Sequence, residues 1–111
     1  MKKAILTGLA VLVLAPGAMR LHAQDAAALW TQHCASCHGK DGKGQTKAGR
    51  MAKVKDLTDA AYMAGFKDDQ IFQDIKNGSK SKDGKEQMKP FQEKLTDEQI
   101  RALVAFVRGL K

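Results

Sequence analysis

The spacing of apolar residues along the chain predicts a series of short helices. The clearest pattern lies near the C-terminus, where Ile100, Leu103, Val104 and Val107 recur at the i, i+3, i+4, i+7 spacing of one helix face. The four residues before them, 96–99, read Thr-Asp-Glu-Gln, a capping box whose outer side chains bond the exposed backbone N–H groups of a helix start. A helix that buries this apolar face is therefore expected after the box.

Three further helices are expected upstream, each with residues that favour its start or its end. Asp25 begins a run of strong helix formers, Thr58 can cap a short helix that Gly65 ends, and Asn77-Gly78 is a clear C-terminal stop. The third of these helices also begins with two aspartates, which the helix dipole favours in the first turn. The expected segments are residues 25–35, 59–64 and 67–77.

Polar, glycine-containing stretches separate these helices. Residues 39–55 combine four glycines with a run of lysine and arginine and show no apolar periodicity, so a loop is expected there. Residues 79–87 form a second polar loop. We find no strand pattern, no internal repeat and no second domain. The fold class is therefore predicted to be all-α, with about four short helices in one domain.

The N-terminus has the pattern of an export signal. Met1-Lys2-Lys3 is a basic start, residues 4–15 form an apolar stretch, and Leu21-His22-Ala23 places alanine directly before a cleavage point. The apolar stretch is shorter than the about 20 residues that a transmembrane helix needs, so no stable membrane insertion is expected. Residues 1–23 are predicted to be a signal peptide, and residues 24–111 a mature periplasmic domain.

Size and charge narrow the possible functions. The chain of 111 residues carries a net charge of +7, and cleavage would leave 88 residues with 16 basic and 12 acidic side chains, a net charge of +4. A domain of this size buries only about 60 to 65% of the surface that its unfolded chain exposes, so an additional stabiliser is usual. The lysines are mixed with acidic residues and aromatic residues are few, which disfavours nucleic-acid binding.

The stretch Cys34-Ala35-Ser36-Cys37-His38 is a C-x-x-C-H motif, which is typical of covalent attachment of a c-type haem. Two thiols at this spacing share one face of a helical turn, so both can reach one edge of a haem. His38 then lies beneath the iron, where a neutral imidazole nitrogen can bind it. Trp30, one turn before Cys34, is expected to form part of the pocket wall, and His33 to be a solvated neighbour.

Three other uses of the cysteine pair are less favoured. Zinc usually needs two further Cys or His ligands, and only His33 and His38 are near, both crowded beside the pair. A redox-active dithiol is expected near a βαβ pattern, which is absent from the sequence. A disulfide would close a very small loop and leave His38 without a role.

Met88 is the expected ligand on the other side of the iron. It stands alone in a polar loop, two residues before Pro90, which fixes the local backbone and biases Lys89 away from helix. A thioether sulfur in such a loop is well suited to bind iron. Met63 and Met51 remain alternatives, as does a position that is open or ligated by histidine.

Taken together, these motifs resemble a small bacterial class I cytochrome c with one haem. The resemblance covers almost the whole mature chain, and implies that residues 24–111 are one cytochrome c domain wrapped around a covalent haem c. It also implies that the first and last helices cross beside the haem, with Trp30 and Phe106 near the crossing. The matching segments are the aromatic residue and C-x-x-C-H motif, residues 39–44, 56–59, 77–78, 88–91 and 95–100.

The resemblance implies that Cys34 and Cys37 carry the haem and that His38 and Met88 ligate its iron. Two features depart from the family pattern. Lys89 follows Met88, where many members have proline directly after the ligand methionine. No proline lies between Cys34 and Met88, although many members use a proline carbonyl there to accept the ring N–H of the histidine.

The function implied is that of a one-electron carrier between redox proteins, monomeric and not an enzyme. The alternatives are a haem subunit of a dehydrogenase or oxidase complex, and a ligand-binding or peroxidatic haem protein. Basic residues flank both ligand-bearing segments and are expected to rim the exposed haem edge, where they would meet an acidic docking patch on a partner; otherwise they only keep the domain soluble. They are Lys40, Lys43, Lys47, Arg50, Lys80, Lys82, Lys85 and Lys89.

Overall fold

The computed structural model describes residue 4, residues 8–11 and residues 18–111. About half of the predicted signal peptide, residues 1–3, 5–7 and 12–17, lies outside these residues, and the cleavage point after Ala23 and the division at residue 24 stay predictions. None of the described helices is long and apolar enough to cross a membrane. In chain order the elements are α1 (Ala18–His33), α2 (Ala35–His38), α3 (Lys47–Ala52), α4 (Ala60–Met63), α5 (Asp68–Asn77), β1 (Ser79–Lys80), β2 (Glu86–Met88) and α6 (Asp97–Arg108).

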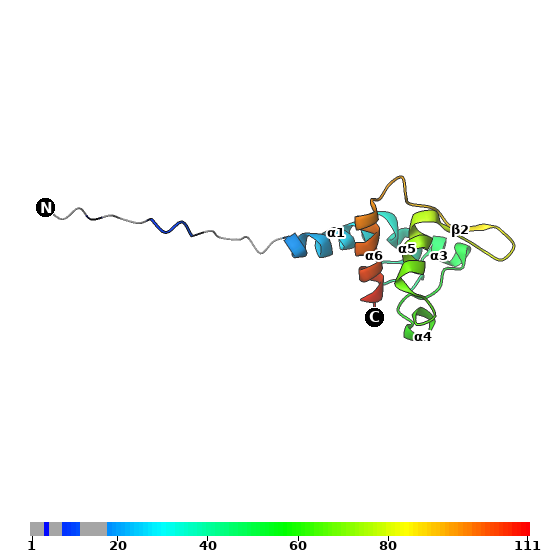
Figure 1. Cartoon of the computed structure of the whole chain (residues 1–111). Coiled ribbons are helices and arrows are strands. Elements are labelled where there is room, and N and C mark those ends of the chain that lie inside the picture. Colours follow the sequence, from blue (N-terminus) through cyan, green and yellow to red (C-terminus); the bar gives the residue numbers. More distant parts are fainter. Residues whose placement is uncertain (1–3, 5–7, 12–17) are drawn as a thin grey trace.

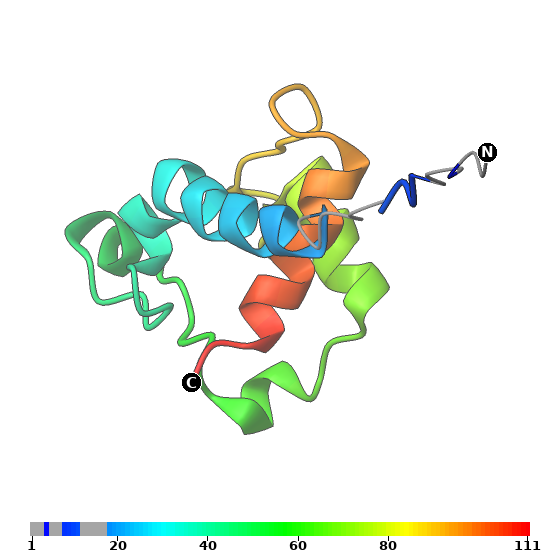
Figure 2. The same ribbon diagram turned by 90° about the vertical axis from the view of Figure 1, so that its left-hand side faces the viewer.

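Helices α1 and α6 cross each other, and α5 packs beside α6 (Figure 1; Figure 2). At the crossing, the Trp30 ring of α1 lies against the Phe106 ring of α6, with 5.2 Å between the ring centroids. The prediction that these two aromatic residues mark the crossing of the first and last helices is confirmed. The all-α fold class is confirmed as well.

The hydrophobic core lies between α1, α5 and α6. Ile100 and Leu103 of α6 are almost fully buried, with exposed fractions of 0% and 1%, and Trp30 of α1 is 3% exposed. The apolar face of α5, Ile71, Phe72 and Ile75, closes the core from the side of α6. Each such side chain contributes about 1.5 to 3 kcal/mol by leaving water, so the predicted apolar stripe of α6, with its four buried residues, stabilises the domain substantially.

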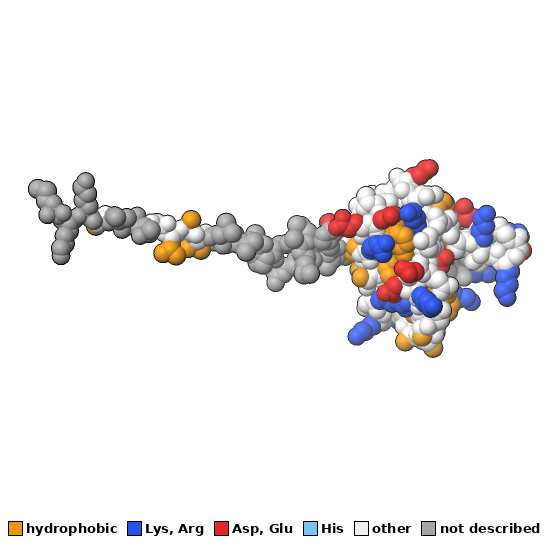
Figure 3. Space-filling view, in the orientation of Figure 1, with side chains coloured by type: hydrophobic (Ala, Val, Ile, Leu, Met, Phe, Trp, Pro, Cys, Tyr) orange, Lys and Arg blue, Asp and Glu red, His pale blue; other side chains and the backbone are white. Residues whose placement is uncertain are grey.

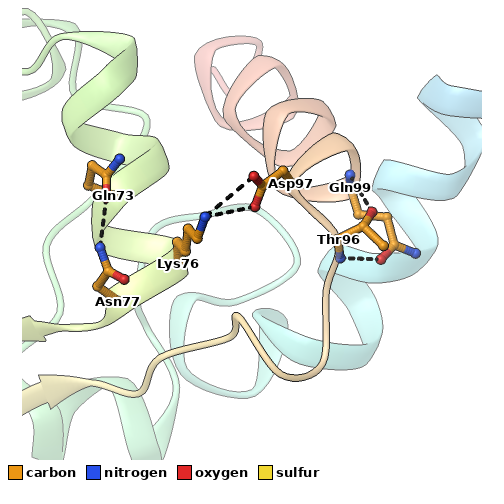
Figure 4. A network of polar contacts seen from close by, with 6 residues as sticks. All are labelled: Gln73, Lys76, Asn77, Thr96, Asp97 and Gln99. Carbon is orange, nitrogen blue, oxygen red and sulfur yellow. Dashed lines mark hydrogen bonds and ion pairs between the residues drawn. The ribbon is translucent and has the colours of Figure 1, made fainter.

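The start of α6 is fixed by polar contacts that the sequence predicts. The Gln99 backbone N–H donates to Thr96 Oγ at 3.1 Å, and the Thr96 N–H donates to Gln99 Oε1 at 2.9 Å, which confirms the capping box (Figure 4). Nearby, Lys76 Nζ lies 3.1 Å from Asp97 Oδ1 and joins the last turn of α5 to the first turn of α6 (Figure 4). The two helices are therefore held together at these ends as well as through the core.

Three helix predictions need correction. Helix α1 begins at Ala18 rather than at Asp25, so Asp25 does not cap it. The stretch 39–55 contains a helix, α3, where only a loop was expected. The short α4 is capped by the Asp59 carboxylate, which accepts the N–H groups of Ala61 and Tyr62, and not by Thr58.

The prediction that the chain has no strands was also wrong. Strands β1 and β2 form an antiparallel hairpin with Ser79 opposite Met88 and an irregularity of register directly after Ser79. The strands are too short, and their side chains too polar, to show an alternating pattern in the sequence. The hairpin projects from the helical body (Figure 1), and its turn contains Gly84, with a φ of +83°.

Candidate functional site

A cavity of about 650 Å³ opens among α1, α2, α5, α6 and the hairpin. This volume lies within the range of about 300 to 1,000 Å³ that is usual for ligand and cofactor pockets. One wall carries Trp30, Cys34, Cys37 and His38, and residues of the predicted motif thus lie together on the cavity. Met88 also lines the cavity. Further lining residues are Met63, Phe66, Ile71, Ile75, Pro90, Phe91, Leu103 and Val107.

The two cysteines lie at the junction of α1 and α2. The chain turns at Cys34, whose carbonyl accepts the N–H of Cys37 at 3.3 Å and that of His38 at 2.9 Å, so the motif is one helical turn as expected. Both thiols are free and partly buried, and the structure therefore does not support the disulfide alternative. Burial, with the neighbouring Cys37 adding to it, raises the pKa of the Cys34 thiol to about 11.

His38 presents a partly buried imidazole to this wall. Its Nδ1 atom is buried without a hydrogen-bond partner, and burial lowers the pKa of the ring below its ordinary value. A neutral imidazole is the form that binds a metal centre. Trp30 packs against this ring, with 5.6 Å between centroids, and its Nε1 donates to the Gly39 carbonyl at 3.0 Å. Trp30 thus holds both the histidine ring and the turn that follows it.

The segment after the motif folds back and bonds it. The Thr46 hydroxyl donates to the Cys37 carbonyl at 2.8 Å and also accepts the N–H of Gly49 at 2.8 Å, so it caps α3. The His38 carbonyl accepts the N–H of Gly44 at 2.7 Å. We call residues 30–57, which include the motif and this segment, the attachment wall. Sequence reasoning missed Thr46 and Gly49, although a threonine before Lys-Ala-Gly-Arg-Met-Ala is itself a helix-start signal.

Two methionines, Met63 and Met88, line the cavity, whereas Met51 is 78% exposed and does not line it. Met63 is buried in the core, and Met88 is a partly buried residue of β2 that packs against it. We call residues 78–91, which carry Met88, the hairpin wall. His33 also lines the cavity and packs edge-on against Phe91, with 5.9 Å between centroids. The expectation that His33 is merely solvated was therefore wrong.

Arg108 holds the segment that carries Met63. Its Nε lies 2.7 Å from Asp68 Oδ1, its Nη1 donates to the Met63 carbonyl at 2.9 Å, and its Nη2 donates to the Phe66 carbonyl. One guanidinium of α6 thus fixes the chain between α4 and α5, which lines the cavity through Met63 and Phe66. Nothing in the sequence separates Arg108 from other basic residues at helix C-termini, so sequence reasoning gave it no role.

The basic residues that line the cavity differ from the predicted rim. Of the eight that were predicted, only Lys89 lines the cavity. The other lysines along its edge, Lys53, Lys55 and Lys94, were not singled out from the sequence. They are exposed, and Asp74 and Glu86 are the acidic residues of the same lining. Lysines therefore outnumber acidic residues in the cavity lining, but three of the four lysines are not among the predicted ones.

Comparison with known protein families shows which family the chain belongs to. The family model described as cytochrome c oxidase, cbb3-type, subunit III, matches residues 22–107. The chain belongs to this family of c-type cytochromes. A comparison with curated proteins found no match.

Solved structures agree with this assignment. The chain is 39% identical to a protein named KustC0563 c-type cytochrome, with a TM-score of 0.68, over 78% of this chain and 98% of that one. A mutant of Kustc0563 is also 39% identical, with a TM-score of 0.66, over 78% of this chain and 99% of that one. The fold and the family of a small c-type cytochrome are thus both shown.

The cofactor of this family is haem c, bound covalently through cysteines, and Cys34 and Cys37 are the only cysteines of the chain. The residues present fit such a group. The cavity is largely apolar on its inner side, both thiols border it, and the unpartnered Nδ1 belongs to an uncharged histidine next to them. Among the described residues, no three His, Cys, Asp or Glu side chains gather as a separate metal site.

Proposed function

We propose that this chain is an exported one-electron carrier whose haem iron is ligated by His38 and Met88. The observation that carries the proposal is the single cavity that both residues line, with Cys34 and Cys37 on the same wall as His38. When bound, the haem supplies one reversible oxidation step at its iron. The residues that would hold the group are Cys34 and Cys37 through their sulfur atoms, and His38 and Met88 at its iron.

The support for Met88 over Met63 comes from their surroundings. Met63 is 8% exposed and belongs to the core cluster beneath α6, where it already fills space between apolar neighbours. Met88 is partly buried at the edge of that cluster, on a strand that borders the cavity. A soft thioether at this position favours the reduced state relative to a second histidine and so raises the potential.

A carrier role follows if both axial positions are filled. An iron held by both His38 and Met88 would leave no site for a substrate, and among residues 18–111 no Ser, His and Asp set was singled out as a competing catalytic site. The exposed lysines at the cavity, Lys53, Lys55, Lys89 and Lys94, support docking to an acidic patch on a redox partner. The solved c-type cytochrome that the chain resembles is matched over 98% of its length, which supports a small, separate carrier.

The family description favours a second candidate, a haem subunit of an oxidase complex, because it names subunit III of such an oxidase. The two differ in their assembly. A free carrier would be monomeric when purified from its own periplasm under mild conditions, whereas a subunit would sediment with a larger complex. Sedimentation velocity of the native protein, followed at the haem absorption, tells them apart.

The ligand assignment is tested by spectroscopy on the haem-loaded protein. We expect the ferric protein to show the weak far-red sulfur-to-iron charge-transfer band, and the ferrous protein to bind carbon monoxide slowly. Met88→Ala should abolish the band and speed carbon monoxide binding, while Met63→Ala should keep both wild-type properties. A band that survives in Met88→Ala and vanishes in Met63→Ala would assign the ligand to Met63. Rapid carbon monoxide binding by the wild type would favour a ligand-binding protein instead.

A further inference from the structure

The backbone that carries Met88 lies unusually close to Gly78. A Cβ atom added at Gly78 would lie 2.6 Å from the Met88 carbonyl oxygen, 3.0 Å from the Pro90 nitrogen and 3.2 Å from the Lys89 carbonyl carbon. All three are backbone atoms of one short segment, so no side-chain rotation can relieve the contact. Gly78 therefore leaves space that the Met88–Pro90 backbone fills.

The conformation of Gly78 gives a second reason for glycine. Its φ of +77° and ψ of 172° lie in a region that only glycine occupies readily. This conformation turns the chain out of α5 directly into Ser79, which pairs with Met88 across the hairpin. The residue that ends the helix thus also sets where the partner strand of Met88 begins.

The end of α5 holds the same segment from its other side. The N–H of Phe91 donates to the Ile75 carbonyl at 3.0 Å, and the N–H of Gln92 donates to the Lys76 carbonyl at 3.1 Å. These carbonyls belong to the last turn of α5, which has no partners within the helix for them. The segment that follows Met88 therefore caps the helix, and the helix in turn fixes the segment.

We infer that Gly78 is a positioning residue for Met88, which holds the thioether within reach of the iron through the close approach of the two backbones. The inference rests on the proposed ligand role of Met88. A side chain at residue 78 would push the Met88–Pro90 backbone outward, away from the end of α5. The hydrogen bonds that hold the cysteine motif would be unaffected, because they involve none of these residues.

The hairpin supplies a matched control. Gly84 also has a positive φ, +83°, and lies in the same hairpin, but a Cβ atom there would meet nothing within 4 Å. Replacing Gly84 therefore imposes the cost of a positive φ without any contact to Met88. Of the two glycines, only Gly78 makes the close approach to the Met88–Pro90 backbone.

The experiment compares haem-loaded wild type, Gly78→Ala, Gly84→Ala and Met88→Ala. Because the cofactor is bound covalently on the attachment wall, each variant keeps its chromophore. We expect Gly78→Ala to lose most of the far-red band and to bind carbon monoxide at least about tenfold faster in the ferrous state, equivalent to about 1.4 kcal/mol. Gly84→Ala should keep the wild-type band and rate. Gly78→Asn, which adds a Cβ atom at the same place, should behave as Gly78→Ala.

The outcomes test the positioning role of Gly78 separately from the proposed ligation by Met88. If Met88→Ala leaves the band and the rate unchanged, the ligand assignment itself is wrong. If Met88→Ala abolishes the band but both Gly78 variants retain it, Met88 is the ligand and the positioning role of Gly78 is overturned. That role is also overturned if Gly84→Ala loses the band as fully as Gly78→Ala, because strain in the hairpin would then account for both. A far-ultraviolet circular dichroism spectrum of each variant shows that its helices are intact.

Discussion

The attachment wall and the hairpin wall border the same cavity but are built in different ways. Around the cysteine motif, the carbonyls of Cys34, Cys37, His38 and Gly39 are all hydrogen-bonded, to N–H groups or to the side chains of Thr46 and Trp30. The hairpin wall contains two very short strands of mostly polar residues that project from the body, with Ser79 and Met88 half-buried and the other strand residues exposed (Figure 1). In the space-filling view, lysine side chains stand out from this projecting part of the molecule (Figure 3). Only its base, near Gly78 and Phe91, is tied to a helix.

The two walls differ in structure because they serve different roles, covalent attachment of the cofactor on one side and the proposed ligation by Met88 on the other. The attachment wall carries the cysteines that bind the cofactor covalently, and its buried and part-buried hydrogen bonds hold the turn that bears the thiols and the histidine. In the proposed function the hairpin wall supplies the second iron ligand, Met88, and its position depends on a few backbone contacts at its base. We therefore expect changes in the first wall to act on cofactor retention and stability, and changes in the second to act on ligation and potential.

The largest effect should come from removing the covalent attachment. Cys34→Ser with Cys37→Ser is expected to release nearly all haem in acid-acetone extraction, whereas Met88→Ala should retain it, because only the first change breaks bonds to the cofactor. The serine variant should also be poorly folded, since a domain of this size loses its main apolar element. The extracted haem and the circular dichroism signal measure both effects. Haem that extracts from the wild type would contradict the assignment.

A second test concerns the packing of α3 on the motif. A Cβ atom at Gly49, which is buried, would clash with the carbonyl oxygen of Cys37 and lie 2.6 Å from that of Gly44. Gly49→Ala is therefore expected to destabilise the protein by about 1 to 3 kcal/mol, as overpacking of a close contact usually does. The denaturation midpoint of the haem-loaded protein measures the loss. Gly65→Ala is the control, because its Cβ would lie 3.4 Å from the nearest atom, the Tyr62 carbonyl oxygen.

If Gly49→Ala were as stable as Gly65→Ala, the contrast between the walls would fail on the attachment side. The proposed contrast between the two walls would also be wrong if Gly49→Ala lost the far-red band without any loss of stability. That result would mean that the attachment wall controls the distal ligand directly.

A third, smaller effect is expected at Thr46. Thr46→Val keeps the shape of the side chain but removes the donor to the Cys37 carbonyl and the cap of α3. We expect a loss of about 1 to 2 kcal/mol in unfolding free energy, with the far-red band unchanged. Thr46→Ser, which keeps the hydroxyl, should recover most of that stability. Equal stability of the valine and serine variants would show that the hydroxyl does not support the motif.

The sequence predicted the elements that rest on local signals. The capping box at Thr96 and the stop at Gly78 are read from a few adjacent residues, and both proved correct. The C-x-x-C-H spacing likewise identified the cofactor, because covalent attachment requires two cysteines and a histidine within five consecutive residues. Where a function needs a short, contiguous pattern, the sequence was sufficient.

The contacts that the sequence did not reveal join distant segments. Arg108 bonds the Met63 carbonyl, and Thr46 bonds the Cys37 carbonyl, across separations that no local pattern encodes. Helix α3 was missed because its glycine and lysines read as a loop, although packing against α2 stabilises it. The hairpin was missed because two- and three-residue strands carry no periodicity.

The smallest effect on stability, and the one that tests function most directly, concerns the lysines at the cavity. Lys55 of the attachment wall and Lys89 of the hairpin wall both line it and are exposed, whereas Lys40 and Lys43 are exposed but do not line it. Exposed charges contribute little to stability, so reversing either pair to glutamate should leave the denaturation midpoint and the potential almost unchanged.

The rate of electron transfer should separate the two pairs. With an acidic redox partner, Lys55→Glu with Lys89→Glu should lower the bimolecular rate at low salt by about tenfold or more, because it removes attraction where the interface forms. Lys40→Glu with Lys43→Glu changes the net charge by the same amount away from that edge, and should have a smaller effect. The differences should shrink as salt screens them, with a Debye length of about 10 Å at 0.1 M. Equal slowing by both pairs would mean that net charge alone steers the encounter and that neither wall forms a defined docking edge. A rate that responds to neither pair nor to salt would leave these lysines with a role in solubility only.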